Sequence, residues 1–197
     1  MQEILASLYT EGEAFSWLEI IGVLTALVYV ALAAKSNRIC FLFGLLSSLI
    51  YIYLATVSKF YFDSFINGYY VLMSVYGWFA WTSKKGLPTI RSLSKVEFII
   101  LITTGLCIAF ILAFIAESYS DASLAYFDAF TTIFAIIATW MVVKRYLENW
   151  LIWIVVDFVA AGMYYYKELY LTSLLFAIYT IVAIFGFFKW KKSEYGT

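Results

Sequence analysis

An acidic side chain lies in the middle of the apolar and aromatic run at 150–166, WLIWIVVDFVAAGMYYY, and is the first candidate for chemistry. This residue is Asp157. A carboxylate at bilayer depth costs about 2.5 kcal/mol or more on insertion scales, so such acids usually face a protein interior or a wet cavity and serve a function. On a helix, Trp153 lies one turn before Asp157 and Tyr164 two turns after it, on the same face. An indole ring, a carboxylate and a phenol on one helix face predict a binding site for a flat, cationic or hydrogen-bonding ligand. In the alternative interpretation, Asp157 is a buried helix-packing acid with a hydroxyl partner.

Other polar and aromatic residues inside the apolar runs complete the predicted substrate site. Asn67, Tyr70 and Ser74 recur at helical spacing along one face of the run at 64–82. Asp128 and Thr132 share a face near the start of the run at 125–143. For Asn67, Ser74 and the threonines, the alternative is hydrogen bonding between helices, worth about 0.6 kcal/mol on average. The predicted substrate-binding residues are Trp153, Asp157, Tyr164, Asn67, Tyr70, Ser74, Asp128, Thr132, Trp140 and Tyr51.

The elements that must position these residues are apolar runs. Of 197 residues, 64% are hydrophobic and only 13% are charged, which indicates an integral membrane protein. At about 1.5 Å rise per residue, each run is long enough to cross a hydrocarbon core of about 30 Å. The fold class predicted is therefore all-α with seven transmembrane helices, at 16–34, 40–57, 64–82, 96–116, 125–143, 150–166 and 169–188.

Charged residues in the loops predict the orientation. Eleven of the 13 lysines and arginines fall on one side: Lys35, Arg38, Lys84, Lys85, Arg91, Lys95, Lys144, Arg145, Lys189, Lys191 and Lys192. The other side has Lys59 and Lys167, each beside an acid. The positive-inside rule then puts the N-terminus outside and the C-terminus in the cytoplasm. The acidic N-terminal segment lacks a basic n-region, which predicts no cleaved secretory signal.

An internal repeat indicates how the helices are grouped. Residues 61–81 align with residues 170–190, and this pairs Ser64 with Ser173, Tyr70 with Tyr179, Gly77 with Gly186 and Trp81 with Trp190. Parallel three-helix repeats joined by a connector helix, a 3+1+3 plan, are expected. The predicted segments are an extracytoplasmic 1–15, a first bundle at 16–82, a cytoplasmic linker at 83–95, a connector helix at 96–116, a second bundle at 125–188 and a cytoplasmic tail at 189–197.

Missing residue types exclude several functions. The chain has no histidine, the commonest metal ligand and proton switch, so neither a metal nor a cofactor is expected. No nucleophile and base lie at usable spacing, so an enzyme is disfavoured. Because no lysine or arginine falls in the central part of any run, the site should prefer an unphosphorylated, neutral or cationic molecule. Cys40 and Cys107 are expected to be free and buried.

Three tryptophans lie near the cytoplasmic ends of the predicted helices. Trp78, Trp81 and Trp190 lie close to the basic loops, where indole rings commonly form an interfacial belt. We therefore expect these three rings at the membrane surface.

The chain resembles the Pnu-type bacterial vitamin transporters, the family of the nicotinamide riboside transporter. The resemblance runs from LEIIGVLTALVYV (18–30) through NRICFLFGLLSSLIYIY (37–53) and VLMSVYGWFAW (71–81) to ENWLIWIVVDFVAAGMYYYKELYLTSLLFAIY (148–179). The resemblance implies a 3+1+3 fold and facilitated diffusion of unphosphorylated vitamins across the bacterial inner membrane. It also implies a cytoplasmic kinase that traps the vitamin by phosphorylation, although no docking motif for a kinase is visible in the sequence. Trp153, Asp157 and Tyr164 match the family's sixth-helix pattern, but Asp157 stands where nicotinamide riboside transporters carry Asn.

This departure favours thiamine as the substrate, with nicotinamide riboside next and riboflavin third. A carboxylate suits the amino group of thiamine's pyrimidine, although both leading vitamins are flat cations that Asp157 and Trp153 would bind. The rival classes are a membrane-embedded vitamin-binding or sensory protein and a structural subunit. The lipid bilayer and a small-molecule vitamin are the expected partners, nucleic acid is not, and the sequence leaves the oligomeric state open. Without histidine or lysine partners for the intramembrane acids, uncoupled transport is favoured.

Overall fold

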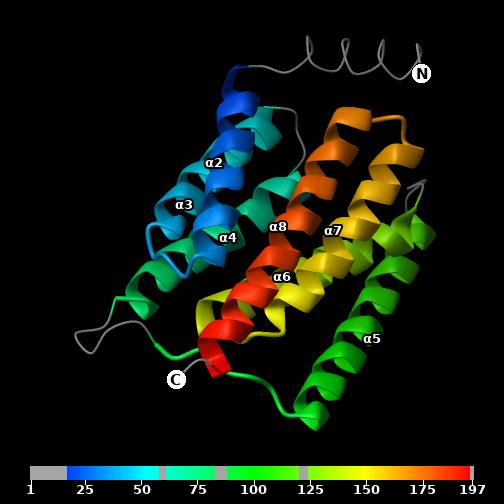
Figure 1. Cartoon of the computed structure of the whole chain (residues 1–197). Helices are drawn as coiled ribbons and strands as arrows, with labels where there is room; N and C mark the ends of the chain where they lie inside the picture. Colours follow the sequence, from blue (N-terminus) through cyan, green and yellow to red (C-terminus); the bar gives the residue numbers. More distant parts are fainter. Residues whose placement is uncertain (1–16, 58–60, 83–87, 120–123, 196–197) are drawn as a thin grey trace.

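The structure is a computed structural model that describes residues 17–57, 61–82, 88–119 and 124–195 (Figure 1). Within these residues the chain forms seven α-helices: α2 (Trp17–Ala34), α3 (Cys40–Val57), α4 (Tyr61–Ala80), α5 (Lys95–Tyr119), α6 (Ala125–Lys144), α7 (Asn149–Tyr166) and α8 (Tyr170–Tyr195). The expected extracytoplasmic segment 1–15 and the start of the expected linker, 83–87, lie outside the described residues.

The helix positions agree with the apolar runs, and their ends differ for local reasons. Helix α5 begins at Lys95 because Ser94 and Glu97 form a reciprocal cap: the Ser94 N–H donates to Glu97 Oε2 at 2.8 Å, and the Glu97 N–H donates to Ser94 Oγ at 3.2 Å. Helix α8 continues past its apolar run to Tyr195. Lysines in its last turns favour this extension, because they are good helix formers and complement the helix dipole.

Consecutive helices pack against each other in two series. Helix α3 contacts α2 and α4, while α6 contacts α5 and α7, and α7 contacts α8. The two series meet where α2 packs on α8 and α4 packs on α6. Figure 1 shows α5 at the outer edge, apart from α2, α3 and α4.

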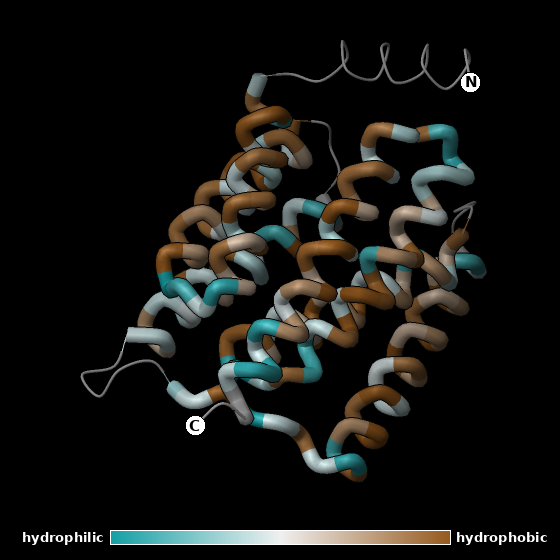
Figure 2. Tube along the Cα trace, viewed as in Figure 1, coloured by the Kyte–Doolittle hydropathy of each residue, from teal (hydrophilic) through white to brown (hydrophobic). Residues whose placement is uncertain are grey.

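The surface of the molecule is apolar along the helices. Helices α2, α3, α5, α6 and α8 are long and apolar enough to cross a membrane. Figure 2 shows hydrophobic residues along the helices, with hydrophilic residues mainly at helix ends and in loops. Helices α4 and α7, also expected to span, fall outside this set. These are the helices that carry Asn67 and Asp157, so their polar residues lower the average hydropathy.

Two of the tryptophans expected at the membrane surface are buried instead. The exposed fraction is 1% for Trp81 and 0% for Trp190, so the interfacial-belt expectation is wrong for both. Their indole N–H groups donate to backbone carbonyls of the other helix series, and buried indoles need such a partner. The cysteines are both free, but only Cys40 is buried; Cys107 is exposed on α5, the helix at the outer edge, whose main packing partner among the described helices is α6.

The repeat seen in the sequence has matching contacts in the structure. Phe41 packs edge-on against Trp81, with ring centroids 4.9 Å apart, and fills the space beside Gly77. Trp150 packs edge-on against Trp190 at 5.4 Å and fills the space beside Gly186. A Cβ at Gly77 would lie 2.2 Å from the Phe41 ring, and one at Gly186 would lie 2.8 Å from the Trp150 ring. Glycine is therefore required at both positions for this close approach.

Candidate functional site

A cavity of about 610 Å³ lies between the two helix series. Its size is in the range of small-molecule binding sites, which are typically about 300–1,000 Å³. Nine of the ten predicted site residues line it: Tyr51, Asn67, Tyr70, Ser74, Asp128, Thr132, Trp153, Asp157 and Tyr164. Trp140, the tenth, lies elsewhere: its ring stacks on Tyr146, with centroids 5.8 Å apart, and its exposed fraction is 38%.

Asp157 forms part of the cavity wall on α7. Its exposed fraction is 4%, and in the part of the chain that the structure describes its carboxylate has no hydrogen-bond or ion-pair partner. Tyr70 of α4 and Tyr179 of α8 lie within electrostatic range of it. Trp153 and Tyr164 line the same cavity from the same face of α7. Among the described residues Asp157 therefore has no hydroxyl partner that would mark it as a packing acid, and its carboxyl group is available to a ligand.

Helix α4 provides the facing wall. Its Asn67 donates one amide hydrogen to the Asp63 carbonyl, 2.9 Å away, which leaves the amide oxygen and the second hydrogen for the cavity. Ser74 is buried, and its hydroxyl lies 3.1 Å from the position that a Cβ on Gly44 would take. Gly44 thus allows α3 and α4 to approach while the cavity stays open beside them.

One end of the cavity is acidic and partly exposed. Asp128 forms an ion pair with Lys167 at 3.7 Å, and both side chains are partly exposed to solvent or lipid. Tyr164 stacks on Phe176 with ring centroids 5.2 Å apart and ring planes 10° apart. Glu19 also lines the cavity. A partly exposed pair such as Asp128 and Lys167 contributes only about 0–1 kcal/mol to stability, so the pairing is readily exchanged.

The sequence prediction missed several lining residues. Tyr29, Phe176, Tyr179 and Glu19 contribute aromatic rings or charge to the wall. Tyr179 could have been found, because it is the repeat partner of Tyr70. Glu19, an acid in the first turn of an apolar run, was also a visible signal. Nothing in the local pattern distinguishes Tyr29 or Phe176 from a lipid-facing aromatic residue.

The charges on the wall define the ligand chemistry. Glu19, Asp128 and Asp157 line the cavity, and no lysine or arginine does so among the described residues. Without a basic group, a phosphate would have no charged partner. The aromatic rings of Trp153, Tyr70 and Tyr179 offer π faces to a flat cation. The arrangement thus suits a planar, cationic or neutral, unphosphorylated molecule.

Comparison with known proteins agrees with this geometry. The nicotinamide mononucleotide transporter family matches residues 16–192. The chain belongs to this family. Members are membrane transporters, so the chain is a membrane protein of a transporter family and not an enzyme. The match also confirms the resemblance to the Pnu-type transporters, although it does not separate a thiamine-transporting branch.

Individual relatives in the family are similar over most of their length. The nicotinamide riboside transporter PnuC of Escherichia coli (strain K12) is 21% identical over 92% of this chain and 88% of that protein. The protein of the same name from Haemophilus influenzae is 27% identical over 90% of this chain and 80% of that protein. A crystal structure of the vitamin B3 transporter PnuC superposes with a TM-score of 0.72 at 20% identity, covering 97% of this chain and 89% of that one. The last comparison supports the fold.

Proposed function

We propose that this protein carries nicotinamide riboside across the bacterial inner membrane by facilitated diffusion. The observation that carries the proposal is Asp157, which lies on the wall of a ligand-sized, aromatic cavity and has no hydrogen-bond or ion-pair partner among the described residues. Nicotinamide riboside has a flat pyridinium cation, a carboxamide and ribose hydroxyls. The carboxylate of Asp157 and the ring of Trp153 suit the cation, while Asn67 and Tyr70 suit the carboxamide and the hydroxyls.

The relatives support nicotinamide riboside over thiamine, which the sequence had favoured. The matched relatives carry the name nicotinamide riboside transporter. The preference for thiamine rested on a single carboxylate, and a carboxylate attracts either cation. Nicotinamide mononucleotide, after which the family is named, carries a phosphate for which the cavity has no lysine or arginine among its described lining residues. We expect the mononucleotide to be rejected.

The proposed mechanism moves one helix group against the other. In the proposed 3+1+3 plan, α2–α4 and α6–α8 are the two bundles, α5 is the connector, and residues 88–94 are the described part of the linker. The N-terminus lies outside and the C-terminus in the cytoplasm, in agreement with the distribution of basic residues. The cavity opens to each side in turn as the bundles rock. A cytoplasmic kinase would trap the vitamin, and transport needs no proton gradient.

The test measures uptake and binding together. Purified protein in proteoliposomes should exchange labelled nicotinamide riboside, and Asp157→Ala should abolish exchange while the protein still purifies as a folded species. Thr56→Ala is a matched control, because that hydroxyl contacts Ser64 on the surface and does not line the cavity. Unchanged exchange in Asp157→Ala would refute the site.

Three further measurements distinguish the alternative substrates and functions. Competition by thiamine, riboflavin and nicotinamide mononucleotide ranks the substrates, and tighter binding of thiamine would restore the sequence-based preference. Binding by calorimetry without any counterflow would instead assign the chain to membrane-embedded vitamin-binding proteins. Accumulation above equilibrium under an imposed pH gradient would contradict uncoupled transport.

A further inference from the structure

At the end of the cavity nearest the basic loops, three buried side chains join the two helix series. We name Trp81, Arg145 and Trp190 the inner seal. Their exposed fractions are 1%, 4% and 0%. The cluster of buried residues that holds both tryptophans also contains Phe41, Val142 and Trp150, which line the cavity. The inner seal therefore lies directly beneath the cavity floor.

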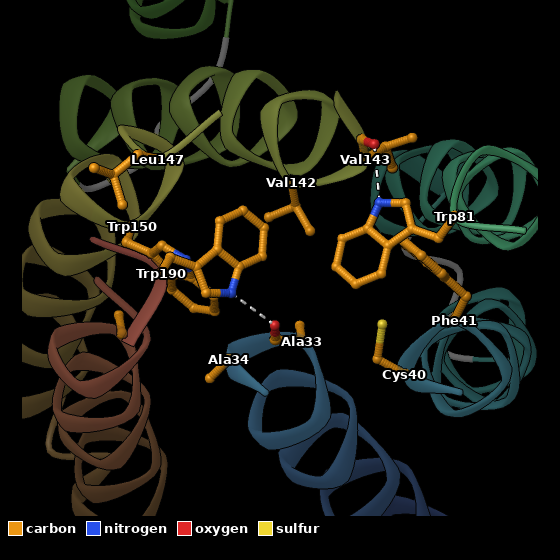
Figure 3. Close-up of a cluster of buried hydrophobic side chains, with 11 residues drawn as sticks. Ala33, Ala34, Cys40, Phe41, Trp81, Val142, Val143, Leu147, Trp150 and Trp190 are labelled. Carbon is orange, nitrogen blue, oxygen red and sulfur yellow. Dashed lines mark hydrogen bonds between the residues drawn. The ribbon is translucent and has the colours of Figure 1, made fainter. Parts of the chain in front are cut away.

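The two tryptophans bond reciprocally across the molecule. Trp81, which follows α4, donates its indole N–H to the Val143 carbonyl near the end of α6, at 3.0 Å. Trp190 of α8 donates to the Ala33 carbonyl near the end of α2, at 3.1 Å. Figure 3 shows the two indoles pointing to opposite sides of the cluster, each toward a carbonyl of a different helix. Carbonyls in the last turn of a helix lack partners within that helix and are open to outside donors. The Ala33 carbonyl accepts from the Ser36 N–H at 2.9 Å in addition to the Trp190 indole.

Within the inner seal, Arg145 contacts both tryptophan rings. Its guanidinium carbon lies 4.7 Å from the Trp81 ring centroid and 5.1 Å from the Trp190 ring centroid, and its Nη2 donates to Ser36 Oγ at 3.2 Å. Ser36 and Arg145 are 109 positions apart and occupy equivalent turns with left-handed backbone, at φ 54° and 60°. Burial lowers the pKa of Arg145 to about 10, so the guanidinium stays charged at neutral pH.

The closed arrangement leaves polar atoms unsatisfied. Nε and Nη1 of Arg145 and Nε1 of Trp150 are buried without a hydrogen-bond partner among the described residues. Buried donors without partners raise the free energy of the closed state, and exposure to water would satisfy them. The contacts that join the two helix series here are thus opposed by polar groups that would gain hydrogen bonds to water if the series separated.

We propose that the inner seal is the cytoplasmic gate of the transporter, an inference that rests on the proposed function and orientation. Release of substrate to the cytoplasm separates Trp81 from α6 and Trp190 from α2. It also separates Arg145 from Trp81 and Ser36, while Arg145 and Trp190 stay together on the α6–α8 bundle. Because the two bonds are reciprocal, both must break when the helix groups part at this end.

Cys40 is a natural reporter for this gate. Its exposed fraction is 0%, and it belongs to the same buried cluster as the two tryptophans (Figure 3). In a Cys107→Ser background, a membrane-impermeant maleimide added from the cytoplasmic face reaches Cys40 only when the gate opens. The labelling rate then measures the open fraction without any ligand.

The experiment removes the indole N–H donors while keeping an aromatic ring at each position. Trp81→Phe and Trp190→Phe should each raise Cys40 labelling about fivefold, and the double variant about 25-fold, because each loses one net hydrogen bond. The Kd for nicotinamide riboside should stay within about threefold of wild type, since neither residue lines the cavity. Unchanged labelling in all three variants, or an equal rise with reagent on the opposite face, overturns the gate.

Arg38 offers a matched control for Arg145. It also stacks on a tryptophan, 5.1 Å from the Trp78 centroid, and donates to a hydroxyl, Thr82 Oγ1 at 3.1 Å, but these contacts stay within the α2–α4 side and are exposed. Arg145→Lys should raise labelling, while Arg38→Lys should change it less than about twofold; equal effects would contradict a gate. A wild-type protein that neither binds nor exchanges nicotinamide riboside contradicts the proposed function, and the Cys40 result is scored independently.

Discussion

Helices α3 and α7 occupy equivalent positions in the proposed repeat, yet they contribute very different side chains to the cavity. At their buried ends they match: Phe41 of α3 and Trp150 of α7 each pack on a glycine and a tryptophan. Further along, at the same offset of 109 positions, α3 has Gly44 and Ser48 where α7 has Trp153 and Asp157. A large ring on both walls would fill the hollow. At this level α7 therefore provides the recognition groups and α3 provides the room, whereas one turn further on Tyr51 of α3 faces the cavity opposite the small Ala160 of α7.

The strongest test of this division compares Asp157 with its counterpart Ser48. Asp157→Ala should raise the Kd for nicotinamide riboside at least about 30-fold, because losing one partner of a buried charge pair costs about 2–5 kcal/mol. Ser48→Ala should raise it less than about threefold. Calorimetry on both purified variants measures the difference, and similar losses would mean that the two walls share recognition.

The buried ends should behave alike under a second comparison. Gly77→Ala and Gly186→Ala should both lower the melting temperature, because overpacking costs about 1–3 kcal/mol of folding free energy. The effect of Gly77→Ala should be larger, since the Phe41 ring is nearer to its added Cβ than the Trp150 ring is to that of Gly186→Ala. Gly162→Ala is the control, since no atom lies within 4 Å of its added Cβ. That control should leave the melting temperature unchanged or raise it. A tolerated alanine at both positions would argue against equivalent packing.

Tyr70 and Tyr179 form a third pair, equivalent in the repeat and both close to Asp157. Loss of one hydroxyl removes about 1 kcal/mol of hydrogen bonding, so Tyr70→Phe and Tyr179→Phe should each raise the Kd about fivefold. Binding titrations of the two variants side by side check the symmetry. If only one variant is affected, the ligand lies against one bundle.

Substitutions at the acidic end of the cavity should have the smallest effect on transport. Glu19 and Asp128 are also separated by 109 positions and both line the cavity. Because Asp128 is partly exposed and paired with Lys167, solvent screens its charge. Glu19→Gln and Asp128→Asn should each change the rate of uptake by less than about twofold, and less again at high salt. A large, salt-insensitive loss in either would place that carboxylate in contact with substrate.

Much of this fold was predictable because membrane spans leave long apolar runs, and the run boundaries agree with the helices to within a few residues at most ends. The site was predictable where a polar residue was costly, as with Asp157 and Asn67. Aromatic residues were harder. Trp140 and Trp153 have the same chemistry, but only the packing of α6 and α7 decides which one reaches the cavity. From the sequence, Trp81 and Trp190 could not be distinguished from tryptophans at the membrane surface. The carbonyls that accept their N–H groups belong to helices distant in sequence, so no local pattern predicted that the two rings are buried.

The segment before α5 is fastened to the loop that carries Arg145. The Arg91 N–H donates to the Arg145 carbonyl at 2.9 Å, the Leu147 N–H donates to the Arg91 carbonyl at 2.8 Å, and the Leu93 N–H donates to Glu148 Oε1 at 3.1 Å. Helix α5 is therefore anchored to the C-terminal half at its entrance as well as through α6. If the two bundles rock as proposed, α5 moves together with α6–α8, and the chain passes from one moving group to the other between α4 and Arg91.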